Sequence, residues 1–123
     1  MKFYRCKLCG NIVVKVVDGG GTLSCCGQEM TELKAGVTDA ALEKHVPAFK
    51  REGDTLSVQI GEVIHPMTPE HYIQCILVQQ GERVQYVALN SNDEPKATFT
   101  INPDESATIY EYCNLHGLWK AEA

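Results

Sequence analysis

Four of the six cysteines of this 123-residue chain lie close to its start, and their spacing limits how that part can fold. Cys6 and Cys9 enclose two residues, whereas Cys25 and Cys26 are adjacent. A segment of about 36 residues buries too little apolar surface to fold alone, and it usually needs a metal, disulfides or a partner. A disulfide between adjacent cysteines requires a strained geometry, but adjacent thiolates can share one metal ion. Residues 1–36 are therefore predicted to be a small metal-stapled domain.

The cysteines also bear on the metal and on the compartment. Four thiolates suit either iron or zinc, and the sequence does not choose between them. The alternative is that the four are buried structural thiols or a redox pair. The first residues contain no apolar stretch typical of an export signal, so we expect a cytoplasmic protein. In a reducing cytosol, cysteines are better metal ligands than disulfide partners.

Composition argues against two classes of function. The chain has a net charge of −5, and its Lys and Arg residues are scattered singly. It therefore lacks the basic face that binding to nucleic acid requires. No apolar run reaches the length of about 18 residues that a transmembrane helix needs, so we expect no membrane span.

The pattern along the chain predicts short antiparallel strands throughout. Residues 12–17 read as a strand that turns at 18–21 and returns at 22–24, which predicts a hairpin. Residues 40–44 form at most one helical turn, because Pro47 stops a helix. Regularly spaced turns beyond that point indicate an antiparallel sandwich at 37–123, so the fold class is all-β. The expected strands of the sandwich are 56–60, 72–79, 83–89, 96–101 and 107–113.

All four histidines lie in this second part, and each stands at the edge of an expected element. They are His45, His65, His71 and His116, the last of which follows the expected final strand. Cys113 and His116 are three residues apart, a spacing at which a tight turn lets both bind one ion. A single histidine is more often a surface or hydrogen-bonded group. Four of them together with Cys113, at the loop ends of a rigid sandwich, favour a metal site.

Cys75 is expected to stay outside that site. If one strand begins at His71, Cys75 lies four residues along it, at a distance of roughly 13 Å, which is too far to share an ion. We interpret Cys75 as a buried apolar filler. Four imidazoles and the thiolate of Cys113 remain. Catalytic zinc usually takes three protein ligands, so five donors with one open position fit iron better.

These residues stand in motifs that resemble those of the superoxide reductases. The motifs are Glu43-Lys44-His45-Val46-Pro47, His65-Pro66-Met67, His71-Tyr72-Ile73 and Glu111-Tyr112-Cys113-Asn114-Leu115-His116-Gly117. The first four cysteines are similar to the desulforedoxin-type domain that precedes the reductase domain in desulfoferrodoxin, the two-iron form. The resemblance covers nearly the whole chain. It implies a small rubredoxin-like domain joined to an immunoglobulin-like sandwich, in a homodimer.

The resemblance further implies two iron ions per chain and a role for each ligand. An FeS4 centre would be held by Cys6, Cys9, Cys25 and Cys26. The active iron would have His45, His65, His71 and His116 as equatorial ligands and Cys113 as the axial ligand. Glu43 matches a glutamate that can occupy the sixth position of ferric iron, and Lys44 matches a lysine near the open site. Cys75 departs from the family, in which tryptophan is common at this position.

The reaction implied is the one-electron reduction of superoxide to hydrogen peroxide, with an external electron donor of the rubredoxin type. Two alternatives follow from the residues themselves. One is a rubredoxin-like electron-transfer protein that works through the first four cysteines. The other is a zinc-stapled binding module without redox activity. Neither alternative explains the five spaced ligands of the second part.

Overall fold

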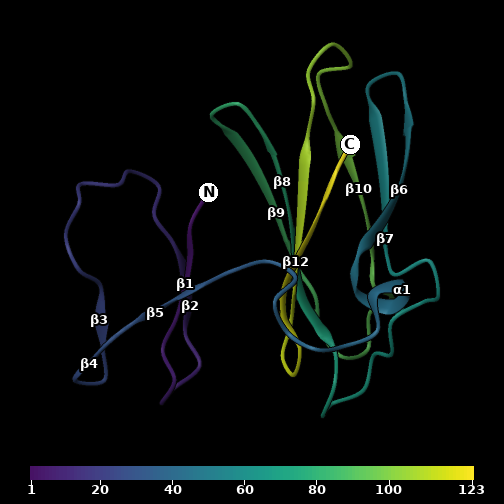
Figure 1. The fold of residues 1–123 in the computed structure, drawn as a ribbon. Coiled ribbons are helices and arrows are strands. Elements are labelled where there is room, and N and C mark those ends of the chain that lie inside the picture. The colour runs from purple at the N-terminus through teal and green to yellow at the C-terminus, as the bar shows by residue number, and fades with distance from the viewer. The chain divides into compact units, whose positions relative to one another are not determined.

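The computed structural model describes all residues 1–123, and the chain divides into two compact units, Met1–Lys34 and Ala35–Ala123. Nearly every element is a β-strand, and the exception is the four-residue helix α1 (Leu42–His45) (Figure 1). The predicted all-β class is therefore confirmed. No helix of the chain is long and apolar enough to cross a membrane.

The first unit has a small sheet and a two-stranded ribbon. The sheet has the antiparallel order β2-β1-β5, and the ribbon pairs β3 with β4. Only three apolar side chains, Phe3, Cys6 and Met30, are buried in this unit, at 1, 3 and 8% exposure. Such a core is too small to hold the unit together by apolar burial alone. The strands are β1 (Phe3–Arg5), β2 (Ile12–Val14), β3 (Ser24–Cys25), β4 (Gln28–Glu29) and β5 (Thr31–Leu33).

The hairpin predicted for this unit is wrong in its pairing. Strand β2 ends at Val14 and pairs with β1, while Val16 and Val17 are exposed. Strand β3 instead pairs with β4 across Cys26 and Gly27, whose φ angles are 52° and 76°. Two successive residues with positive φ form the tight turn that suits the twist of a hairpin. The adjacent cysteines therefore lie at a turn, where Cys26 adopts a conformation that only a few non-glycine residues adopt.

The second unit is a sandwich of two antiparallel sheets, as predicted (Figure 1). One sheet has the order β10-β7-β6, and the other has the order β12-β11-β8-β9. The strands of the first sheet are β6 (Pro47–Glu52), β7 (Thr55–Ile60) and β10 (Lys96–Thr100). Those of the second are β8 (Ile73–Gln80), β9 (Arg83–Ala88), β11 (Thr108–Cys113) and β12 (Gly117–Glu122).

The core lies between the two sheets and follows from the period-2 pattern of their strands. On β7, Leu56, Val58 and Ile60 are at most 3% exposed, and they pack in one cluster with Ile76 of β8 and Ile109 of β11. Successive side chains of a strand point to opposite faces, so this alternation buries one face of the sheet. The sandwich thus provides a rigid frame whose loop ends carry the histidines.

Strands β6 and β12 were not predicted. The strand expected at 107–113 is β11, which does end at Cys113, but the expectation that it is the last strand is wrong. Strand β6 is an edge strand with a single buried residue, Pro47, so it shows no apolar alternation. Strand β12 follows Cys113 after a tight turn and pairs with β11 in register, with Cys113 opposite Gly117. His116 therefore lies in a turn between two paired strands, which fixes its distance from Cys113 more firmly than a loose C-terminal segment would.

Candidate metal centres

The cysteines of the first unit form a compact group of four sulfurs. The Sγ atoms of Cys6, Cys9, Cys25 and Cys26 all lie within 4.8 Å of one another. The Cys9 and Cys25 sulfurs are 3.6 Å apart and those of Cys25 and Cys26 are 3.9 Å apart, and all four thiols are free. Two sulfurs bound tetrahedrally to one ion at about 2.3 Å would be about 3.8 Å apart. The group therefore fits a single four-coordinate ion.

The protonation of this group also favours a cation. The backbone N–H of Cys9 points at the sulfur of Cys6 and, as the largest cause, lowers the pKa of Cys6 to about 6. Hydrogen bonds between neighbouring sulfurs, that with Cys9 first, raise the pKa of Cys26 to about 12. Four neighbouring thiols cannot all ionise to thiolates without a positive charge between them. A bound metal ion supplies that charge and displaces the protons.

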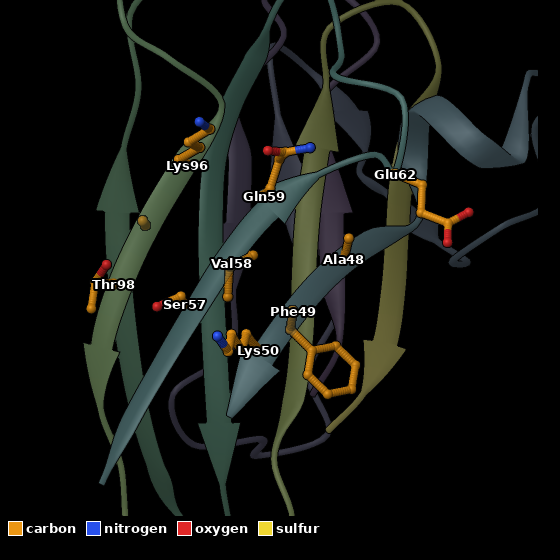
Figure 2. A pocket seen from close by; sticks show the side chains of 10 residues that line it. Ala48, Phe49, Lys50, Ser57, Val58, Gln59, Glu62, Lys96 and Thr98 are labelled. Carbon is orange, nitrogen blue, oxygen red and sulfur yellow. The ribbon is translucent and has the colours of Figure 1, made fainter. Parts of the chain in front are cut away.

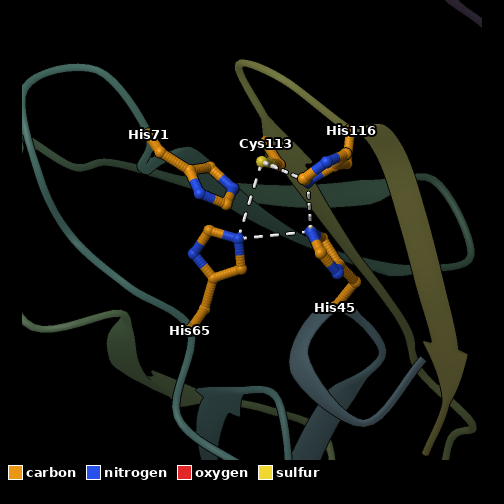
Figure 3. A group of neighbouring side chains, drawn as sticks. All are labelled: His45, His65, His71, Cys113 and His116. Atoms are coloured by element: carbon orange, nitrogen blue, oxygen red, sulfur yellow. Dashed lines mark hydrogen bonds between the residues drawn. The ribbon is translucent and has the colours of Figure 1, made fainter. Parts of the chain in front are cut away.

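The four histidines and Cys113 form a second group, which joins three regions of the sandwich (Figure 3). Each residue offers a ligand atom, and these atoms lie within 4.8 Å of one another. Helix α1 supplies His45, Cys113 ends β11, and His116 lies in the turn between β11 and β12. The loop between β7 and β8 supplies His65 and His71. The structure thus brings together five residues that lie up to 71 positions apart in the sequence.

Gly61 and Val63 fix this loop against α1. A side chain at Gly61 would collide with the backbone of Lys44 and Val63, and its φ of 84° also favours glycine. The Val63 N–H donates to the Glu43 carbonyl at 2.9 Å. Since α1 carries His45 and the loop carries His65, this close backbone contact sets the distance between two imidazoles of the group.

The four imidazole rings stand at the corners of a rough square. Neighbouring ring centroids are 4.6–4.9 Å apart, whereas His45 and His71 lie opposite each other at 6.4 Å. The Nε2 atom of His45 lies 3.0 Å from Nδ1 of His116 and 3.2 Å from Nε2 of His65. Nitrogens bound at right angles to one ion at about 2.1 Å are about 3 Å apart. His116 thus presents Nδ1 to the group, and His45 and His65 present Nε2.

The remaining ring nitrogens explain these orientations. Nδ1 of His45 lies 2.8 Å from the Ala41 carbonyl, and Nδ1 of His65 lies 2.7 Å from the Pro66 carbonyl. A carbonyl oxygen can only accept, so Nδ1 must carry the proton in each bond. Nε2 then keeps a free lone pair that can bind a metal ion. Nε2 of His71 is buried without any hydrogen-bond partner. An unpartnered buried nitrogen is costly, and a metal ion would satisfy it.

The surroundings of the group keep its imidazoles neutral, and they leave the Cys113 thiol in need of a cation before it ionises. Burial lowers the pKa of His45 and His71, and it lowers that of His65 to about 4. Burial raises the pKa of Cys113, whereas the backbone N–H groups of Leu115 and His116 favour its thiolate. Neutral imidazoles and a thiolate are the forms that bind metal ions. The group therefore suits a cation, and its five donors exceed the four that zinc commonly takes.

Glu43 and Lys44, the two other predicted site residues, lie on α1 beside His45, and both are exposed. The positive charge of Lys44 is a smaller cause, after burial and the neighbouring histidines, of the lowered pKa of His45 and of His71. The ammonium group therefore acts on two corners of the square. No atom of Glu43 or Lys44 belongs to the group of ligand atoms.

Two residues that contact the ligands or their chain neighbours were not singled out from the sequence. Trp119, which is 2% exposed, packs against His45 with ring centroids 5.1 Å apart and donates from Nε1 to the His116 carbonyl at 3.0 Å. Asn114 hydrogen-bonds through its side chain to Glu70 and Tyr72, the neighbours of His71. The only sequence signal for Asn114 was its place between the ligands Cys113 and His116. Trp119 gave no signal for the site, because a tryptophan in a strand more often indicates a core residue.

Cys75 and a surface hollow of the second unit lie apart from both groups. Cys75 is in β8, which begins at Ile73, so His71 and Cys75 do not share a strand as we had assumed. Burial raises the pKa of Cys75 to about 12, which makes it an inert thiol. A hollow of about 410 Å³ over β6, β7 and β10 contains no group of metal ligands, and we assign it no chemistry (Figure 2). Its lining residues include Phe49, Lys50, Ser57, Gln59 and Lys96.

Comparison with known proteins covers both units. The family model described as desulfoferrodoxin matches residues 37–122, and that of the desulfoferrodoxin N-terminal domain matches residues 1–33. A desulfoferrodoxin homolog of Archaeoglobus fulgidus is 46% identical over 121 residues, which cover 98% of this chain and 96% of the relative. The desulfoferrodoxin of Nitratidesulfovibrio vulgaris is 46% identical over 99% of this chain and 96% of its own. A crystal structure of the superoxide reductase from Treponema pallidum superposes with a TM-score of 0.78 at 32% identity, over 98% of this chain and 97% of that one.

Proposed function

Because this chain belongs to the desulfoferrodoxin family, we propose that it is a superoxide reductase that converts superoxide to hydrogen peroxide. The observation that carries the proposal is the square of four imidazoles with one thiolate beside it. In the balanced reaction, one superoxide takes up one electron from an external donor and two protons, and no O2 is released. A redox-inactive zinc staple would not need such a donor set.

Two groups of this chain would hold the iron ions that the reaction requires. We propose Cys6, Cys9, Cys25 and Cys26 as ligands of the first ion, and the four histidines with Cys113 as ligands of the second. At the second centre, iron would supply a reducing electron and an open position for superoxide. The thiolate of Cys113 would donate electron density to the iron and so tune its reduction potential, as thiolate ligands do in haem proteins.

Glu43 and Lys44 would act at the open position. Superoxide is an anion, and a chain with a net charge of −5 repels it at long range. Lys44, whose charge is felt by His45 and His71, would offset this repulsion and bring protons to the product. Glu43, next to it on α1, would take the vacated position after the product leaves. Both roles come from the family resemblance.

The donor, the assembly and the compartment belong to the same proposal. A rubredoxin-type protein would deliver the electron, and the chain would form a homodimer in the cytoplasm. Five of the six cysteines lie in the two ligand groups and none forms a disulfide, which suits a reducing compartment and supports the last point.

Metal content and product analysis test the proposed function. The full chain, purified in air, should contain two iron ions and absorb visible light. It should consume superoxide only when an electron donor is present, and it should release peroxide without O2. A colourless protein with zinc in both groups would support the binding-module alternative instead, and an iron protein that leaves superoxide unchanged would support the electron carrier.

Replacing Lys44 by glutamine should slow the association of superoxide about tenfold at low ionic strength, because local positive charge focuses an anionic substrate. The dependence of that rate on salt should flatten, since the screened attraction is gone. Rapid-mixing kinetics over a range of salt concentrations measure both. Lys50→Gln is the matched control: it removes the same charge from an exposed lysine of β6 that pairs with Glu52 at 2.9 Å. Equal effects of the two variants would show that only net charge matters.

A further inference from the structure

We infer that Asn114 is a positioning residue, whose carboxamide fixes His71 relative to Cys113. The inference rests on the proposed function, because it assigns both residues to one metal centre. Neither the resemblance nor the comparisons gives Asn114 a role. Three hydrogen bonds support the inference, together with a contrast between His71 and two of the other histidines, His45 and His65.

The three hydrogen bonds connect Asn114 to both neighbours of His71. The Tyr72 N–H donates to Asn114 Oδ1 at 2.9 Å, and Asn114 Nδ2 donates to the Glu70 carbonyl at 2.9 Å. The Asn114 N–H donates to the Tyr72 carbonyl at 3.2 Å. An amide side chain has one acceptor and one donor end, so it can satisfy an N–H and a carbonyl of one segment at the same time. Since Asn114 directly follows Cys113, these bonds set the position of His71 relative to the thiolate.

His71 needs this support more than His45 and His65 do. Nδ1 of each of their rings is held by a carbonyl at 2.7–2.8 Å, whereas the ring of His71 makes no hydrogen bond through either nitrogen. The ring of His71 is therefore placed mainly by its backbone. Thr68 holds that backbone on one side, through N–H to carbonyl bonds of 2.9 and 3.1 Å in both directions. Asn114 holds the flanking residues on the other side.

The sheet itself cannot do this. The pairing of β8 with β11 shifts in register after Tyr112, and its last pair joins Cys113 to Ile73. The regular ladder thus stops two residues short of His71. Asn114 continues the connection with one backbone bond and two side-chain bonds, at the point where the ladder fails. Partners that orient metal ligands in this way typically contribute 10–100-fold to metal affinity.

The test compares metal binding in full-length variants. Asn114→Leu removes both side-chain bonds and keeps a similar volume, while Asn114→Asp keeps the acceptor for Tyr72 and loses the donor to Glu70. Titration of the metal-free chain with Co²⁺ follows the two groups separately, because a four-thiolate and a histidine-rich site absorb differently. We expect affinity at the histidine group to fall about 10–100-fold in Asn114→Leu and by less in Asn114→Asp, with a shifted absorption band. The four-cysteine group should bind as before.

Asn102→Leu is the control, because Asn102 also accepts a backbone N–H, that of Asp104 at 3.0 Å, in a turn without ligands. It should lower thermal stability without changing the affinity. If both Asn114 variants bind Co²⁺ at the histidine group with unchanged affinity and spectrum, the inference is wrong, whatever their stability. If the leucine variant does not fold, the aspartate variant carries the test. Its added negative charge would by itself favour a cation, so a lower affinity for Co²⁺ in this variant must come from the lost hydrogen bond. Failure of the unsubstituted chain to bind metal there would overturn the proposed function as well.

Discussion

Replacing Cys113 by serine is expected to abolish the chemistry of the second centre and to leave the first centre intact. Cys113 is fully buried, with its sulfur 3.5 Å from Nε2 of His65 and 3.9 Å from Nδ1 of His116. A serine hydroxyl does not ionise near neutral pH, so the donated negative charge is lost. We expect superoxide consumption to fall more than about hundredfold, since loss of even an outer-shell partner costs 10–100-fold. The visible band of the second centre should shift or disappear.

Cys75→Ser is the matched control for this prediction. It makes the same atomic change in the neighbouring strand β8, at a thiol that belongs to neither group of ligands. Iron content, the visible spectrum and the rate of peroxide formation should all stay close to those of the unsubstituted chain. If Cys113→Ser retains its rate, or if Cys75→Ser loses it, the assignment of the thiolate ligand is wrong.

The fold could be predicted wherever burial gives a strand a period of two. Strand β7 shows this, because its alternating Leu56, Val58 and Ile60 all face the core. Strand β6 lies at a sheet edge with one buried residue, so its sequence carries no such pattern. The mostly apolar residues 12–17 indicated a longer strand than the one observed. Strand β2 (Ile12–Val14) is short because β1 offers only three residues to pair with it. Pairing partners are properties of the whole fold, and local propensity does not determine them.

The ligand residues of the site could be predicted from spacing and resemblance, but the residues that orient them could not. The structure gathers the nine predicted ligands into two groups. Trp119 and Asn114 act through contacts that depend on the register of β12 and on the end of the β8–β11 ladder. A sequence does not contain that register. Metal ligands are a small class of residue types, whereas almost any polar or aromatic residue can support one.

Removing the ligands of the first centre is expected to unfold the first unit. Cys9 and Cys26 are both exposed, so the double replacement Cys9→Ser with Cys26→Ser takes away two ligands and almost no packing. The unit buries only three apolar side chains, and a structural metal contributes on the order of 10 kcal/mol to the folding of such a domain. Backbone amides of β1, β2 and β5 should then exchange with solvent as in an unfolded chain. Hydrogen exchange followed by mass spectrometry measures this strand by strand.

The second unit should be unaffected, because its own core and all five ligands of the other group lie within residues 35–123. The double variant should therefore hold one iron ion per chain and still reduce superoxide. Leu8→Ser is the control: Leu8 lies between Cys6 and Cys9, and its side chain is 63% exposed and belongs to neither group of ligands. Protected amides in the first unit of the double variant would mean that its fold does not depend on metal. A loss of donor-dependent turnover with the second centre intact would instead assign the first iron a part in electron delivery, beyond stapling its domain.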